Sequence, residues 1–153
     1  MIESSSKTIE SMHRSKIYNQ TESTIDFSKL IPVFQRYAQI DAVYLFGSVA
    51  TGTPNRFSDI DLAIVTKDVD LRRVKLDLIM AIEATGIRNV DLLFFPIESY
   101  LLAFEAVRLH EVIYQREDFD RGSFFSLIAR QYFDFQPFIQ AQREAYKRRS
   151  RNG

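Results

Sequence analysis

Three aspartates stand where they could do chemistry together. Asp59 and Asp61 are separated by one residue, and Asp91 stands alone at the start of the apolar run Val90 to Phe95. If residues 59 to 65 form a strand, its period-two geometry puts Asp59 and Asp61 on one face with their carboxylates close together. Such carboxylates repel each other, and hard divalent cations with oxygen ligands relieve that repulsion.

Asp91 extends the pattern to a second strand. A carboxylate in an otherwise apolar strand needs a partner or a metal. If that strand lies beside the Asp59 strand, three carboxylates converge and can bind two Mg²⁺ ions that bridge a triphosphate. Each acid alone has an ordinary explanation, as a solvated edge, a cap or a satisfied buried acid. Their conjunction on strand ends favours the catalytic interpretation.

A Gly47-Ser48 pair precedes Asp59 by ten intervening residues. It follows the β-branched and aromatic run Val43 to Phe46, which predicts a buried strand that stops at a tight turn. A glycine lets main-chain N–H groups approach a phosphate, and the serine hydroxyl adds a donor at the start of a short helix. A lone Gly-Ser after a strand is more often only a turn.

The surrounding pattern predicts a mixed α/β (α+β) sheet with flanking helices and a long helical C-terminal segment. The predicted strands cover residues 43–46, 59–65, 90–95 and 112–114. The first predicted helix begins at Asp26, and three more cover residues 70–84, 98–109 and 118–149. The last of these is predicted to be kinked or broken at Pro137. Residues 1–24 are predicted to be a mobile arm or a weakly docked helix, 25–117 the catalytic domain and 118–153 a helical extension that packs on the domain, a partner or both.

Composition sets the broad class. The 153 residues fit one domain, and the balance of 20 Lys+Arg against 20 Asp+Glu argues against a protein that coats nucleic acid. The absence of cysteine excludes disulfides and thiolate sites, and two histidines make a histidine zinc site a poor fit. No run of about 20 apolar residues and no signal sequence is present, so we expect a cytoplasmic protein without a membrane partner.

The spacing Gly47-Ser48-x10-Asp59-x-Asp61, followed by Asp91, resembles the signature of the DNA polymerase β-type nucleotidyltransferase superfamily. Residues 45–52 and 57–63 resemble the minimal nucleotidyltransferase (MNT) antitoxins, which are MntA-like, and the similarity runs from about residue 40 to 116. This resemblance implies that Asp59 and Asp61 ligate the metals and that Asp91 ligates one and helps to deprotonate the acceptor. It also implies that Gly47 and Ser48 bind the β- and γ-phosphates.

By the same resemblance, the protein is an antitoxin and a Mg²⁺-dependent adenylyltransferase. It would use two Mg²⁺ ions and ATP, and transfer AMP to a tyrosine of a cognate HEPN-type ribonuclease toxin. Two alternatives remain open: a nucleotidyltransferase acting on a small molecule such as an aminoglycoside, and an antitoxin that neutralises its toxin by contact without catalysis.

The sequence departs from the family pattern at three positions. Val49 and Thr51 stand where basic residues are often found, so Arg56 or a partner chain would have to neutralise the triphosphate. His110 stands where glycine is common, and we interpret it as a turn residue rather than a catalytic base.

Burial of the C-terminal helix in the monomer is the ordinary explanation for most of its aromatic residues. Their number exceeds what docking on its own domain requires, and this surplus indicates a protein interface. These residues are Phe124, Phe125, Tyr132, Phe133, Phe135, Phe138 and Tyr146. The segment ends in a basic cluster, for which a solvated helix terminus is the ordinary explanation. The cluster comprises Arg143, Lys147, Arg148, Arg149 and Arg151.

Overall fold

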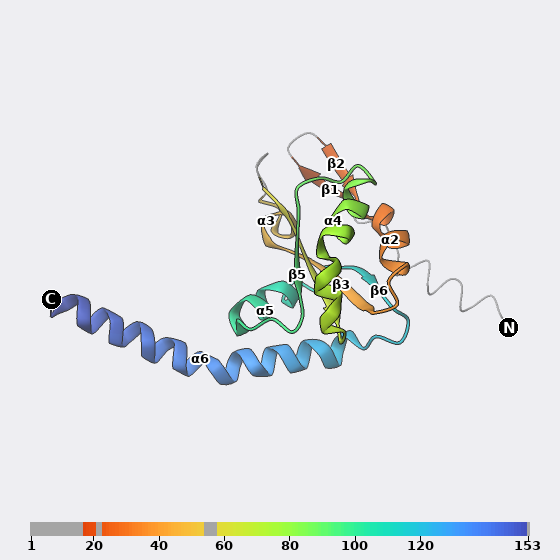
Figure 1. Cartoon of the computed structure of the whole chain (residues 1–153). Coiled ribbons are helices and arrows are strands. Elements are labelled where there is room, and N and C mark those ends of the chain that lie inside the picture. Colours follow the sequence, from red (N-terminus) through yellow and green to blue (C-terminus); the bar gives the residue numbers. More distant parts are fainter. Residues whose placement is uncertain (1–16, 21–22, 54–57, 153) are drawn as a thin grey trace.

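A four-stranded mixed sheet forms the centre of the computed structural model, which describes residues 17–20, 23–53 and 58–152 (Figure 1). Its strand order is β5-β4-β3-β6, with β3 antiparallel to both neighbours and β4 parallel to β5. These strands are β3 (Ile40–Phe46), β4 (Ile60–Thr66), β5 (Val90–Phe94) and β6 (Val112–Gln115). The predicted mixed sheet is therefore confirmed, and so is each of its four strands, with shifted ends.

Helices cover both faces of the sheet. On one face, side chains of β3, β4 and β5 pack against the 3-10 helices η1 (Phe27–Leu30) and η2 (Val69–Val74) and the helices α2 (Ile31–Gln35) and α4 (Lys75–Glu83). On the other, they pack against α5 (Tyr100–Val107) and the start of α6 (Arg121–Arg151). Alternation along β4 sends Leu62 and Ile64 to the first face and Ala63 and Val65 to the second.

The helix predicted to begin at Asp26 is a 3-10 turn followed by α2. Asp26 caps it by accepting a hydrogen bond from the Ser28 backbone N–H at 3.0 Å, and Pro32 lies in the first turn of α2. Before it, β1 (Ile17–Gln20) and β2 (Ser23–Asp26) form an antiparallel hairpin. The sequence pattern predicted no strand there, because strand pairing between two four-residue segments leaves little periodicity to detect.

The C-terminal segment is one helix, α6, rather than two. Pro137 lies inside it, and Figure 1 shows the ribbon bending near the middle of α6, so of the two predicted outcomes, a kink or a two-helix break, the structure has the kink. A proline removes one main-chain donor without ending the helix when the turns on either side keep their own hydrogen bonds. No helix in the described ranges is long and apolar enough to cross a membrane.

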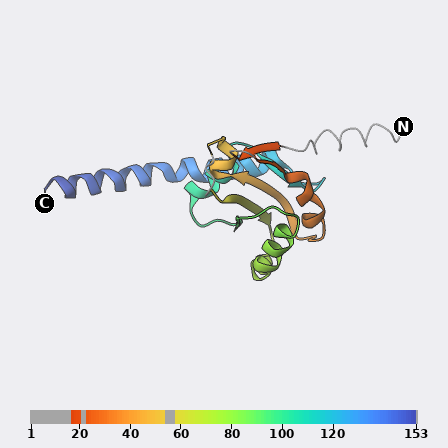
Figure 2. The ribbon, with the colours of Figure 1, turned by 90° about the horizontal axis from the view of Figure 1, so that it is seen from above.

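Only the first part of α6 is docked. Ile128 is buried on the sheet side, and Phe124 packs edge-on against Phe95 with ring centroids 5.0 Å apart. Farther along, Phe138 and Tyr146 are 65% and 73% exposed. Figure 1 and the view from above in Figure 2 both show the distal turns of α6 projecting away from the sheet.

The buried face of α4 provides a direct test of this packing. Leu78 is fully buried and Leu76, two residues earlier on the same helix, is 67% exposed. We expect Leu78→Ala to lower the free energy of unfolding by about 3 kcal/mol through lost burial and a residual cavity. Leu76→Ala, the matched control, should change it by less than about 0.5 kcal/mol. Urea denaturation followed by circular dichroism measures both, and equal losses would contradict the arrangement of α4.

Candidate active site

The sheet register brings the predicted residues to one end of the sheet. Asp61 of β4 is paired with Asp91 of β5 in parallel register, and on its other side Asp61 is paired with Phe46 of β3. Gly47 follows Phe46 directly, and Asp59 immediately precedes β4. Paired residues share a face of the sheet. The carboxylates of Asp61 and Asp91 therefore lie on the same face, and the chain turns at Gly47 next to them.

The three acids differ in exposure. Asp59 and Asp91 are exposed, whereas Asp61, the middle one, is partly buried. Burial raises the pKa of the Asp61 carboxyl above its ordinary value, and the negative charges of Asp91 and then Asp59 raise it further. The negative charges of Asp91 and Asp59 therefore act on the carboxyl of Asp61, the most buried of the three.

Gly47 is the position where the backbone comes closest to this carboxylate. Its φ is +73°, in the left-handed region, and a Cβ built there would overlap the Asp61 carboxylate. The chain turns here from β3 into α3 (Gly47–Thr51), whose first turn carries Ser48. The first N–H groups of a helix have no partner within it and are available to an anion. The glycine is thus required both by its φ and by the proximity of Asp61.

The positions that depart from the family pattern have other roles in this chain. Val49 is 1% exposed and belongs to the core beneath α3. The Thr51 hydroxyl donates to backbone carbonyls within α3, at 3.1 Å from Ser48 O and 3.3 Å from Gly47 O. Neither side chain supplies a positive charge. Arg56, the other predicted source of one, lies outside the residues that the structure describes.

The structure adds a cation that the sequence analysis missed. Lys75, at the start of α4, places its Nζ 3.3 Å from Asp91 Oδ1. In the sequence Lys75 follows Arg72 and Arg73, a run of charges that reads as an ordinary solvated helix face. Sequence spacing gave no sign of the contact, because it depends on how α4 lies against β5.

The donor set suits a hard divalent cation such as Mg²⁺, since it consists of carboxylate oxygens that repel one another in its absence. Among the residues described, no three acids or histidines are already close enough to hold a metal. Asp91 is instead paired with Lys75. The chemistry of the site therefore fits a metal, and Asp59, Asp61 and Asp91 are the residues that would hold it.

His110 is not part of this group. Its φ is +55°, which agrees with the predicted turn. The centroid of its ring lies 4.4 Å from the centroid of the Phe125 ring. His110 precedes β6, at the edge of the sheet opposite β5. Its place in the fold gives it no contact with the aspartates.

The proximity of Gly47 to Asp61 has a measurable consequence. We expect Gly47→Ala to cost about 1–2 kcal/mol for the left-handed backbone and to displace the Asp61 carboxylate as well. Gly52→Ala is the matched control, because Gly52 has a φ of +74° and nothing within 4 Å of an added Cβ. Mn²⁺ binding should be lost in the first variant and kept in the second, and equal binding would contradict the described proximity.

Comparison with known proteins agrees with the fold. A family model described as "Polymerase beta, Nucleotidyltransferase" matches residues 28–119. No curated protein matches the chain. Solved structures do match, including a mutant of the toxin–antitoxin pair MntA–HpeT, with a TM-score of 0.64, 21% identity and coverage of 82% of this chain and 98% of that one.

Two further structures have similar scores. A toxin–antitoxin with AMP-PNP matches with a TM-score of 0.62, 22% identity and coverage of 82% and 98%. A tri-AMPylated Shewanella oneidensis HEPN toxin in complex with MNT antitoxin matches with a TM-score of 0.56, 20% identity and coverage of 81% and 94%. At these identities the likeness is one of fold. Because the nucleotidyltransferase model spans more than half of the sequence, the chain belongs to the polymerase beta nucleotidyltransferase family.

Proposed function

We propose that this protein is an antitoxin that transfers AMP from ATP to a tyrosine hydroxyl of a cognate HEPN-type toxin and thereby neutralises it. The observation that carries the proposal is the register of β4 and β5, which sets Asp61 beside Asp91 at the turn where Gly47 begins α3. Three acids beside a turn whose main-chain N–H groups are available to an anion suit phosphoryl transfer. Catalysis of that reaction depends mainly on positioning and charge neutralisation.

In this proposal the aspartates divide the work. Asp59 and Asp61 hold Mg²⁺, and Asp91 completes the site on the β5 side and accepts the proton of the tyrosine hydroxyl. Bound Mg²⁺ neutralises charge on the triphosphate. The tyrosine oxygen attacks the α-phosphorus, the bond from that phosphorus to the β-phosphate oxygen breaks, and pyrophosphate leaves. Gly47 and Ser48 bind the outer phosphates through main-chain N–H groups and the hydroxyl.

The similar structures support this choice of acceptor. One contains a tri-AMPylated HEPN toxin with an MNT antitoxin, and another is a toxin–antitoxin with AMP-PNP. A third carries a double replacement of aspartate by glutamate at two positions separated by one residue, which is the spacing of Asp59 and Asp61.

One observation favours a second candidate, an antitoxin that neutralises its toxin by contact alone. Val49 is a core residue and Thr51 bonds the backbone of α3, so neither neutralises a triphosphate. A small-molecule nucleotidyltransferase has less support, because the similar structures are toxin–antitoxin complexes.

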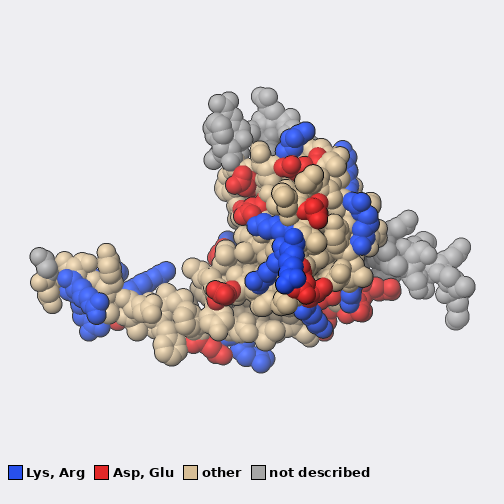
Figure 3. Space-filling model, in the orientation of Figure 1, with Lys and Arg blue, Asp and Glu red and all other residues tan. Residues whose placement is uncertain are grey.

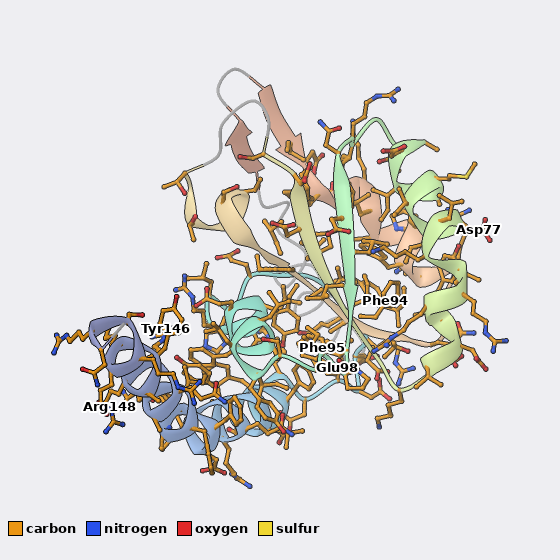
Figure 4. The ribbon with its side chains drawn as sticks, turned by 60° about the vertical axis from the view of Figure 1, so that its left-hand side comes forward. Asp77, Phe94, Phe95, Glu98, Tyr146 and Arg148 are labelled. Carbon is orange, nitrogen blue, oxygen red and sulfur yellow. The ribbon has the colours of Figure 1, made fainter. Side chains whose placement is uncertain are left out.

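The exposed part of α6 is the surface that we assign to the partner protein. Its distal turns carry Arg143, Lys147, Arg148, Arg149 and Arg151 against the single acid Glu144. Figure 3 shows this charge gathered at the end of α6, and Figure 4 shows Tyr146 and Arg148 on turns away from the sheet. A partner with an apolar groove and acidic rims would bury the exposed rings of this segment and pair with its basic residues.

The transfer reaction can be tested directly. With Mg²⁺ and α-labelled ATP, we expect the protein to label its cognate HEPN-type toxin. Asp61→Asn should lower the labelling rate at least about 100-fold, because it removes a charged oxygen ligand from the centre of the site. Asp77→Asn, which removes an exposed acid of α4, should leave the rate unchanged.

The same experiment distinguishes the catalytic antitoxin from the antitoxin that acts by contact alone. If Asp61→Asn still neutralises the toxin although labelling is lost, contact alone accounts for the antitoxin effect. Unchanged labelling in Asp61→Asn would instead remove the aspartates from the mechanism. Labelling of a small hydroxylated compound but not of the protein would point to the small-molecule reaction.

The partner surface has its own test. Phe138→Ala removes a ring that is 65% exposed on α6, and we expect it to weaken toxin binding about tenfold without lowering the melting temperature. Leu76→Ala removes an equally exposed apolar side chain from α4 and should not affect binding. Calorimetric titration against the toxin measures both, and equal affinities for the two variants would exclude this part of α6 from the interface.

A further inference from the structure

A single ion pair distinguishes Asp91 from the other two acids of the site. Lys75 Nζ lies 3.3 Å from Asp91 Oδ1, with the two side chains 43% and 66% exposed. Among the described residues, no ion pair joins Asp59 or Asp61 to a cation. Within the described ranges, a lysine thus supplies a positive charge to one carboxylate and no ion pair supplies one to the other two.

The backbone of Lys75 is held firmly at this place. Leu71, four residues earlier, is 3% exposed, and Leu78, three residues later, is fully buried, so the helix turn that carries Lys75 is anchored from both sides. Arg72 Nη2 donates to Pro96 O at 2.7 Å and to Phe94 O at 3.5 Å. These bonds tie η2 to the chain around the end of β5. Lys75 is therefore held alongside the strand that carries Asp91.

The path of the Lys75 side chain depends on the sheet topology. β5 is an edge strand, and α4 packs on the face that contains Leu92 and Phe94. Asp91 alternates with these residues and lies on the opposite face, with Asp61. Lys75 therefore reaches Asp91 around the open edge of β5. A lysine has a long flexible stem and a compact charge, so it can hold this position and also leave it at little cost.

We propose that Lys75 is a positioning residue that occupies Asp91 in place of a metal, and that Asp91 enters the metal site only when its contact with Lys75 is broken. This inference rests on the proposed function, because it takes the three aspartates to be the metal site. It gives the site an order, in which Asp59 and Asp61 meet the ion first and Asp91 joins it on release from Lys75.

The location of the pair decides which part of the reaction it governs. Gly47 lies beyond Asp61 on the β3 side, whereas Lys75 and Asp91 lie on the β5 side. Lys75 is therefore distant from the turn proposed for the outer phosphates. It acts on the carboxylate proposed to accept the acceptor proton, and does not replace the basic residues missing at positions 49 and 51.

The test measures Mn²⁺ binding by the decrease of the free-ion signal in electron paramagnetic resonance, with no nucleotide and no partner present. We expect Lys75→Met to tighten Mn²⁺ binding about threefold, the amount expected for loss of a competing exposed ion pair. Lys75→Arg should bind as the natural protein does. Arg73→Met is the matched control, since Arg73 is two residues away, 83% exposed and paired with Asp70; it should change binding by less than about 1.5-fold.

A double-mutant cycle separates the specific pair from a general loss of positive charge. In an Asp91→Asn background, Lys75→Met should no longer tighten Mn²⁺ binding. Tightening that persists there, or an equal effect of Arg73→Met, would overturn the role assigned to Lys75. Failure of the natural protein to bind Mn²⁺ at all would instead overturn the metal site, and with it the proposed function. Because Lys75 and Arg73 are on the surface, melting temperatures should be equal across the set.

Discussion

The repulsion between neighbouring carboxylates at one end of the sheet is the constraint on which the site depends. Asp61 shares its face with Asp91 because β4 and β5 are in parallel register, and Asp59 immediately precedes β4. Burial and these two negative charges together raise the pKa of Asp61. The stable sheet beneath them, with Leu62, Ile64 and Leu92 almost fully buried, keeps the acids together despite that repulsion. The repulsion is what a cation would relieve.

Much of this arrangement follows from the sequence. Apolar runs at 43–46 and 90–95 predict buried strands. The chain turns out of the first of these strands at Gly47, where a glycine is needed because the backbone passes close to a carboxylate. The aspartates could be assigned to one face by strand period alone, provided that β4 and β5 are neighbours. The adjacency of β4 and β5 is a feature of the tertiary structure, and the sequence indicated it only through the family resemblance.

The features that could not be predicted from the sequence share one physical cause, which is their dependence on how distant elements pack together. Lys75 contacts Asp91 because Leu71 anchors η2, because Leu78 anchors α4, and because β5 is an edge strand. None of these conditions leaves a local sequence pattern. The same holds for Val49, whose burial is decided by the angle at which α3 leaves β3. The exposure of the distal turns of α6 likewise depends on where the domain ends. Aromatic content alone could not tell which rings in this helix are docked and which are free.

The two ends of the sheet differ in how their charged side chains are paired. At the end away from Gly47, Arg116 donates to Ala38 O at 2.9 Å and pairs with Asp41 at 3.2 Å and with Asp118 at 3.1 Å, so its charge is matched by fixed neighbours. That cluster joins the start of β3 to the chain that leads into α6, as a structural ion network does. At the other end, acids are brought together, and in the described part of the chain the ion pair of Lys75 with Asp91 is the one that involves them. In the function proposed above, a bound Mg²⁺ supplies the positive charge that opposes their mutual repulsion.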